Sequence, residues 1–191
     1  MNIVSGSAGS LPAGVYHRTG AYRHRVFIEQ LKWELPVTGG IEQDQFDRPD
    51  TLYVVAQDEE GEVCGCARLL PTTVPYLLGE VFPQLMNGAA PPRSPDVWEL
   101  SRFAAVDFSD ASASPLRQFS ARTAVALLRA AIACARERGA KRLITVSPLG
   151  IERLLRREGF NAHRAGPPLN IDGHLIFACW IEVEPEQVSI S

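Results

Sequence analysis

The sequence lacks long apolar runs. Nowhere in its 191 residues is there the stretch of about 18 apolar residues that a membrane-spanning helix needs. Residues 1–16 contain neither the basic region nor the apolar stretch of a secretory signal. We therefore expect a cytoplasmic protein without a membrane partner. Hydrophobic residues make up 46% of the chain, which is ordinary for a globular protein, and predict a single domain over residues 1–191.

Cysteine is also scarce, with four residues scattered along the chain (Cys64, Cys66, Cys134 and Cys179). This spacing does not predict a disulfide framework, and buried thiols are expected instead. Cys64 and Cys66 point the same way on a predicted strand, but no nearby histidine or cysteine completes a metal-ligand set. We expect no metal site. The Gly-x-Ser-x-Gly turn of many serine hydrolases is absent as well.

Acidic residues are few in one part of the chain. Residues 1–116 contain 8 Lys and Arg against 15 Asp and Glu, whereas residues 117–164 contain 11 against 3. Three arginines at a spacing of seven form one stripe on a predicted helix. A solvated face and a docking surface for an anionic partner both fit this pattern, which favours such docking over general nucleic-acid binding. The candidate docking residues are Arg122, Arg129, Arg136, Lys141, Arg142, Arg153, Arg156 and Arg157.

Hydrophobic periodicity and turn residues predict an α/β fold with a mixed twisted sheet flanked by helices. The order resembles that of the Gcn5-related N-acyltransferases. A fold does not by itself fix a function. The predicted elements are a helix at 22–33, a loop at 34–50, a hairpin of strands 51–57 and 63–70, a short helix at 77–86, a strand at 97–106, a helix from Ser114 and Pro115 to Gly139, a strand at 141–147, a helix ending at Gly159, and strands at 160–164 and 174–183.

The first group of candidate site residues joins one helix to the loop that follows it. Arg23 and Phe27 are four apart and share a helix face, with Trp33 beyond them. Asp44 and Asp47 lie in the loop. Such a set suits a ligand that is cationic, aromatic and carboxylated at once. The alternative is that the aromatic residues form core and the two acids are solvated.

The second group lies within the strand at 97–106. Charged residues of both signs in mid-strand are costly unless they are paired or used. Glu99 and Arg102 are such residues, and Arg68 lies near the end of the preceding strand. A structural ion pair and a site built on the central strand both fit. Strand alternation predicts one face with Glu99, Ser101 and Phe103, and the opposite face with Trp98, Leu100 and Arg102.

These residues resemble the recurrent positions of the acyl-homoserine lactone synthases, the LuxI-type autoinducer synthase family. Nine residues stand in the family's order and spacing: Arg23, Phe27, Trp33, Asp44, Asp47, Arg68, Phe82, Glu99 and Arg102. The stretches Gly-Cys-Ala-Arg-Leu-Leu at 65–70 and Trp-Glu-Leu-Ser-Arg-Phe at 98–103 look like family signatures. The segment 75–83 does too. The resemblance covers roughly residues 15–183.

The resemblance implies an acyltransferase that makes a quorum-sensing signal. Such enzymes take a fatty acyl group from acyl carrier protein and use S-adenosylmethionine as a substrate, without a cofactor. The amine attacks the acyl thioester, and the carboxylate then closes the lactone and releases methylthioadenosine. The likeness is greatest to members that make an unsubstituted, medium-chain octanoyl product.

The resemblance also implies roles for the residues. Glu99 would accept the amine proton, directly or through water, and Arg68 and Arg102 would hold Glu99 and the substrate carboxylate. The S-adenosylmethionine site would comprise Arg23, Phe27, Trp33, Asp44, Asp47, Phe82 and Arg102. Acyl-chain selection would involve Leu100, Ser101, Phe103, Thr145, Val146 and Leu149. The basic residues of 117–164 would dock the carrier protein.

The sequence is also compatible with two alternative functions. An N-acyltransferase that uses acyl-CoA usually places a glycine-rich turn after its central strand, but no glycine occurs between Asp107 and Arg138. A non-catalytic binder of nucleic acid or protein would use the arginine stripe. Such a binder gives no reason for Glu99 and Arg102 in mid-strand.

Overall fold

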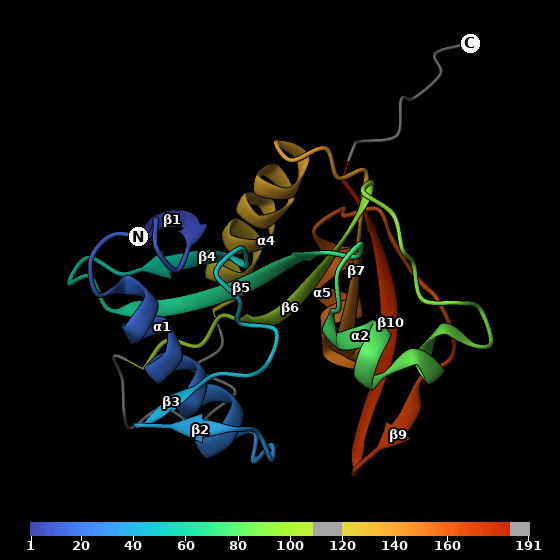
Figure 1. Ribbon diagram of the computed structural model, residues 1–191, viewed down its shortest axis with the longest axis horizontal. Coiled ribbons are helices and arrows are strands. Elements are labelled where there is room, and N and C mark those ends of the chain that lie inside the picture. The colour runs from blue at the N-terminus through green and yellow to red at the C-terminus, as the bar shows by residue number, and fades with distance from the viewer. Residues whose placement is uncertain (109–119, 184–191) are drawn as a thin grey trace. The chain divides into compact units, whose positions relative to one another are not determined.

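The computed structural model describes residues 1–108 and 120–183. These residues form two compact units, the first built from residues 1–69, 102–108 and 120–131 and the second from residues 70–101 and 132–183. Three elements take part in both units: strands β5 (Val63–Pro71) and β6 (Val97–Ala104) and helix α4 (Ala121–Arg136) (Figure 1). The expectation of a single domain stays a prediction.

The sheet of the first unit begins with β1 (Asn2–Ser7), which pairs antiparallel with β4 (Leu52–Gln57). Strand β4 pairs antiparallel with β5, so the predicted hairpin is confirmed. Every residue of β4 is buried, as expected for a strand with neighbours on both sides. Strand β1 was not predicted, because its glycine and serines mask the alternation of a strand.

The helix of the first unit differs from the prediction in its bounds and in its type. Helix α1 (Val15–Arg23) begins after Gly14, whose φ is 77°, and continues as the π-helix η1 (His24–Gln30). The predicted helix at 22–33 therefore starts seven residues late and ends three residues late. π-Helical turns are rare and often occur at functional sites.

The predicted loop at 34–50 contains a small hairpin. Strands β2 (Val37–Thr38) and β3 (Ile41–Glu42) pair antiparallel across Gly39 and Gly40, whose φ angles are 60° and 80°. Two successive positive φ angles define the turn that best fits a two-residue hairpin. The hairpin buries Glu42, which is 1% exposed.

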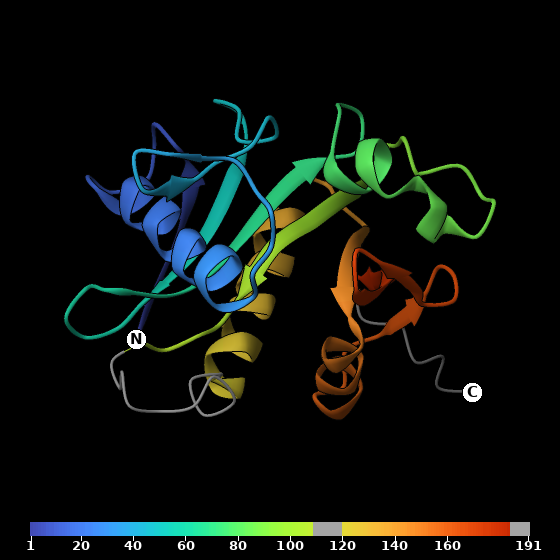
Figure 2. The ribbon, with the colours of Figure 1, turned by 90° about the horizontal axis from the view of Figure 1, so that it is seen from below.

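In the second unit, β6 pairs in parallel with β7 (Arg142–Pro148), from Val97↔Arg142 to Leu100↔Thr145. Strand β7 pairs antiparallel with β10 (His174–Glu182), which also pairs with β8 (Ala162–Arg164) and β9 (Leu169–Ile171). Helix α5 (Leu149–Arg157) packs against β7 and β10 (Figure 2). Helix α2 (Leu77–Val81) and the 3₁₀ turn η2 (Pro83–Met86) correspond to the predicted short helix. Strand β9 was not predicted.

The fold class is confirmed: the protein is α/β, with a mixed sheet flanked by helices. Gly139 and Gly159 follow α4 and α5 with φ angles of 86° and 75°, as predicted for helix ends. The predicted start of the long helix at Ser114 and Pro115 lies outside the described residues. Within the described ranges, no helix has the length and apolar character needed to cross a membrane.

Candidate active site

The first unit contains a ring of alternating charges, which we call the charge ring. Its members are three arginines and three carboxylates, and none of their side chains in these ion pairs is more than 5% exposed. The six formal charges cancel, which lowers the cost of burying them. The residues are Arg23, Arg68, Arg102, Glu42, Asp44 and Asp47.

Asp47 accepts the largest number of contacts in the charge ring. Arg23 binds both of its oxygens, with Nη1 to Oδ1 at 2.7 Å and Nη2 to Oδ2 at 2.9 Å. The Tyr53 hydroxyl donates to Oδ1 at 2.8 Å, and the Asp44 backbone N–H donates to Oδ2 at 2.8 Å. Burial opposes ionisation, but Arg23 and then Arg68 hold the pKa of Asp47 well below its usual range.

Glu42 lies between two arginines, and the sequence analysis missed it. Its Oε2 accepts from Arg23 Nε at 2.6 Å and from Arg102 Nε at 3.1 Å, and its Oε1 accepts from Arg102 Nη2 at 3.0 Å. Burial opposes ionisation here too, yet Arg102 and then Arg23 lower the pKa of Glu42. Glu42 thus joins the helix residue Arg23 to the strand residue Arg102.

Asp44 closes the charge ring between the other two arginines. Its Oδ1 accepts from Arg68 Nη1 at 2.6 Å, and its Oδ2 accepts from Arg102 Nη2 at 2.8 Å. The Phe46 N–H also donates to Oδ1, at 2.9 Å, which fixes the turn that carries both Asp44 and Asp47. Both acids thus contact predicted arginines, and their role in a substrate site stays a prediction.

Arg102 has a backbone φ of 52°, which is uncommon for a residue other than glycine. Such conformations cost energy and cluster at functional sites. This φ interrupts the regular pleat of β6 at Arg102, and both Ser101 and Arg102 are buried, so the predicted division of β6 into two faces stays a prediction. The Arg102 carbonyl accepts a hydrogen bond from the Cys66 thiol, with sulfur and oxygen 3.2 Å apart.

Two aromatic side chains lie beside the charge ring. Phe27 and Trp33 stack with their ring centroids 5.2 Å apart and their planes at 23°. The Arg102 guanidinium lies 5.6 Å from the centroid of Phe27. The structure thus brings together seven predicted residues: Arg23, Phe27, Trp33, Asp44, Asp47, Arg68 and Arg102.

Glu99, the predicted proton acceptor, lies in the second unit and is fully buried. Its Oε1 accepts from the Leu78 N–H at 2.7 Å, and its Oε2 accepts from the Leu77 N–H at 3.1 Å. These are the first amides of α2, which have no partner within the helix itself. Because Arg68 and Arg102 belong to the first unit, their pairing with Glu99 stays a prediction.

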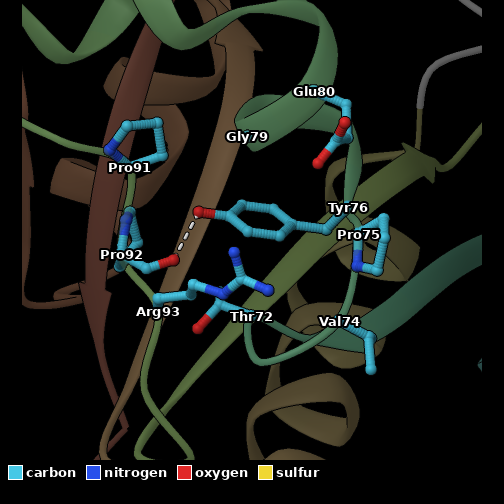
Figure 3. Close-up of a pocket in the computed structure, with 9 residues that line it drawn as sticks. All are labelled: Thr72, Val74, Pro75, Tyr76, Gly79, Glu80, Pro91, Pro92 and Arg93. Atoms are coloured by element: carbon cyan, nitrogen blue, oxygen red, sulfur yellow. Dashed lines mark hydrogen bonds between the residues drawn. The ribbon is translucent and has the colours of Figure 1, made fainter.

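A pocket of about 210 Å³ lies against the segment that holds Glu99 (Figure 3). The hydroxyl of Tyr76 donates to the Pro92 carbonyl at 2.6 Å and fixes the ring in the pocket wall. Burial, and then the charge of Glu99, raise the pKa of Tyr76. The pocket is lined by Thr72, Val74, Pro75, Tyr76, Gly79, Glu80, Pro91, Pro92 and Arg93. Phe82, a predicted substrate-site residue, ends α2 and is half-buried.

The predicted acyl-chain residues belong to both units. Leu100 pairs in register with Thr145, and both are buried together with Ser101. The hydroxyls of Thr145 and Ser147 lie 3.3 Å apart, and Ser147 was not predicted. Val146 and Leu149 are half-buried, and Phe103 falls in the first unit. A role for these residues in acyl-chain binding stays a prediction.

The predicted docking residues divide by what they contact. Arg142 is half-buried, with its guanidinium 4.5 Å from the Trp180 ring centroid, and the other seven are exposed. Four of the exposed residues have partners: Arg136 binds the Val183 carbonyl, Lys141 binds Asp96, Arg156 binds Glu152, and Arg157 binds Glu158. Among the described residues, Arg122, Arg129 and Arg153 have no hydrogen bond or ion pair. These three have the charge most available to a partner.

The described residues include no group of three or more His, Cys, Asp or Glu side chains that could hold a metal ion. The α/β fold with its mixed sheet is also found in a solved acyltransferase. An acyl-CoA N-acyltransferase of Pseudomonas aeruginosa has the same fold, with a TM-score of 0.61 over 94% of this chain and 99% of that one. At 17% identity, this likeness shows the fold alone.

Residues 16–190 match the family model of the autoinducer synthases. An acyl-homoserine-lactone synthase of Acinetobacter nosocomialis is 56% identical over 96% of this chain and 100% of its own. TofI, solved in a ternary complex with an inhibitor and MTA, is 49% identical with a TM-score of 0.83, over 96% of this chain and 92% of its own. BjaI, a CoA-dependent acyl-homoserine lactone synthase solved with SAM and isopentyl-CoA, is 27% identical with a TM-score of 0.80, over 95% and 83%. The chain therefore belongs to the autoinducer synthase family, whose members are acyltransferases.

Proposed function

We propose that this synthase transfers a medium-chain acyl group, octanoyl, from acyl carrier protein to the amine of S-adenosylmethionine. The charge ring, with the stacked Phe27 and Trp33 beside it, is the observation that carries this proposal. S-Adenosylmethionine has an ammonium, a sulfonium, a carboxylate and a flat adenine. The charge ring and the aromatic pair offer a complementary group for each of them.

The residues divide by charge in this proposal. Arg68 and Arg102 would hold the substrate carboxylate through charge-assisted hydrogen bonds. Asp44 and Asp47 would face the ammonium and the sulfonium, and Phe27 with Trp33 would stack on adenine or lie against the sulfonium. The complexes of TofI with MTA and of BjaI with SAM support the assignment of this substrate.

The first chemical step forms an amide. The substrate amine attacks the thioester carbonyl, a C–N bond forms, the C–S bond breaks, and the thiol of the carrier leaves. The ammonium must first lose its proton, and Glu99 would accept it, directly or through one water. The Leu77 and Leu78 N–H groups donate to the two oxygens of Glu99 and fix the orientation of this carboxylate.

The second step closes the lactone. The carboxylate oxygen of the methionine moiety attacks the carbon next to the sulfonium and forms a C–O bond as the C–S bond breaks. Methylthioadenosine leaves with the electron pair on sulfur, so no further proton transfer is needed. Arg68 and Arg102 would align the attacking carboxylate for this ring closure.

Acyl carrier protein is the proposed donor because exposed arginines without partners suit an acidic protein surface. Arg153 on α5 is such a residue. Acyl-CoA is a second candidate donor, favoured by the likeness to the CoA-dependent BjaI. Both donors carry the acyl group as a thioester. Only the rates at which the enzyme uses each donor can therefore decide between them.

Incubation with S-adenosylmethionine and a panel of acyl-carrier-protein and acyl-CoA thioesters tests the proposal by mass spectrometry. Octanoyl-homoserine lactone and methylthioadenosine should form in equal amounts, fastest from octanoyl carrier protein. Faster turnover of octanoyl-CoA would overturn the proposed donor, and preference for another chain would overturn the proposed length. Consumption of thioester without any lactone would overturn the proposed reaction.

Charge reversal at Arg153 tests the docking surface. Arg153→Glu should raise KM for acyl carrier protein about tenfold, because complementary charge mainly governs encounter with an acidic partner. KM for S-adenosylmethionine should stay unchanged. Arg153→Lys is the matched control, since it keeps the charge at an exposed position. Equal KM values for the carrier protein in all three proteins would remove Arg153 from the docking surface.

A further inference from the structure

Tyr53 has a buried phenol ring at the centre of the first unit. It lies on β4, opposite Gly6 of β1 and Arg68 of β5, and is 1% exposed. Its ring belongs to an apolar cluster with Leu11, Val15 and Val55. The ring centroids of Tyr53 and Tyr16 lie 5.3 Å apart in an edge-to-face contact at 65°. Packing on every side thus leaves the ring little freedom to turn.

The Tyr53 hydroxyl points from this apolar cluster into the charge ring. It donates to Oδ1 of Asp47 at 2.8 Å, the same oxygen that binds Arg23 Nη1. The other side chains on Asp47 are the guanidinium groups of Arg23 and Arg68. Burial, and then the charge of Asp47, raise the pKa of Tyr53, so the phenol remains a donor at neutral pH.

We propose that Tyr53 is a positioning residue for substrate binding, which orients the Asp47 carboxylate and through it the guanidinium groups of Arg23 and Arg68. This inference rests on the proposed use of S-adenosylmethionine. On Asp47, Oδ2 accepts from the Asp44 N–H and from Arg23 Nη2, whereas Oδ1 accepts from Arg23 Nη1 and from the Tyr53 hydroxyl. A donor fixed by a packed ring holds this arrangement.

The same hydroxyl ties the charge ring to the beginning of the chain. Leu11 and Val15 pack on the Tyr53 ring and precede residues 16–190, which match the family model. Strand β1 pairs with β4 along all six of its residues, so Tyr53 sits on a strand held from both sides. These N-terminal residues thus help to pack the ring whose hydroxyl donates to Asp47.

Tyr53→Phe tests the proposal, because it removes only the hydroxyl and keeps the ring. Calorimetric binding of S-adenosylmethionine without acyl donor should show a Kd raised about tenfold, since a hydrogen bond to a charged group is lost. KM for S-adenosylmethionine should rise in parallel. The effect should be larger on KM for S-adenosylmethionine than on kcat at saturation. KM for the acyl thioester should not change, because Tyr53 acts through the guanidinium groups and not on the thioester.

Tyr22→Phe is the matched control in the same unit. Tyr22 is also buried, but within the described residues its hydroxyl bonds to backbone groups of Cys64 and Val106 and not to a carboxylate. This variant should lose stability in thermal unfolding without a change in Kd for S-adenosylmethionine. A merely structural role for Tyr53 predicts the same behaviour for both variants.

The outcomes separate this inference from the proposed function. Unchanged affinity in folded Tyr53→Phe, with tight binding by the wild type, would overturn the role of Tyr53 alone. An equal rise of Kd in Tyr53→Phe and Tyr22→Phe would also overturn it. The loss of affinity would then follow from removing any buried phenol hydroxyl in this unit. Failure of the wild type to bind S-adenosylmethionine or to form a lactone would instead overturn the proposed function.

Discussion

Replacement of Glu99 by glutamine is expected to lower the rate of lactone formation by roughly two to four orders of magnitude, the usual contribution of a proton-transfer group. Glutamine has the same shape, and its carbonyl oxygen can still accept from the Leu78 N–H. Its NH₂ group cannot accept from Leu77 and cannot take a proton from the substrate amine. Single-turnover measurement of amide formation shows the loss at the chemical step.

A matched control distinguishes the loss of proton transfer from a change in folding. Glu80→Gln removes an exposed carboxylate from α2, the helix whose first amides bind Glu99, and should leave turnover unchanged. Binding of S-adenosylmethionine to Glu99→Gln should remain measurable, since the charge ring lies in the other unit. Lactone formation at the wild-type rate by folded Glu99→Gln would exclude Glu99 as the proton acceptor.

The elements that could be predicted from the sequence are those that depend mainly on their own residues. The hairpin of β4 and β5 has two runs of apolar residues around an acidic turn, and such a pattern depends on nearby residues only. Strand β1 contains a glycine and two serines among its six residues, and β9 has only three residues. They exist because β4 and β10 offer free edges, which no local pattern reveals.

Seven residues of the site could be found from residue type and spacing, but Glu42 could not. Glu42 falls in the predicted polar loop at 34–50, because β2 and β3 have only two residues each. The pair Gly39 and Gly40 between two short apolar runs was the available signal for a hairpin. A predicted hairpin pairs Glu42 with Val37. If the carboxylate of Glu42 is then buried, it requires a cationic partner.

The partners of the buried charges were also beyond a local pattern. Strand alternation placed Arg102 opposite to Glu99, but the positive φ of Arg102 interrupts the alternation. The side chain of Arg102 then meets Glu42, sixty residues away in the chain. Glu99 similarly binds backbone amides of α2, which carry no sequence signature. Residue types predict that a charge must be paired, whereas the fold decides with which group.

Replacement of Arg68 by leucine is expected to destabilise the protein by about 3–5 kcal/mol, the usual effect of removing one partner from a buried ion pair. The Arg68 side chain is fully buried and binds Asp44 at 2.6 Å and Asp47 at 3.3 Å. Leucine would fill part of the space but would leave two buried carboxylates with one cation fewer. Urea unfolding at neutral pH should show a lower midpoint with an unchanged slope.

The pH dependence of the free energy of unfolding identifies the cause of the stability loss in Arg68→Leu. The pKa of Asp47 is lowered in the folded protein, so its ion pairs stabilise the fold above the ordinary aspartate pKa of about 3.9 and progressively less below it. Without Arg68 that pKa should rise. The difference in free energy of unfolding between wild type and Arg68→Leu should therefore be largest at neutral pH. It should narrow below about pH 4, as the carboxylates take up protons.

Arg93→Leu, at an exposed arginine, should show neither the stability loss nor its pH dependence. A difference that stays constant with pH would assign the loss to packing rather than to charge.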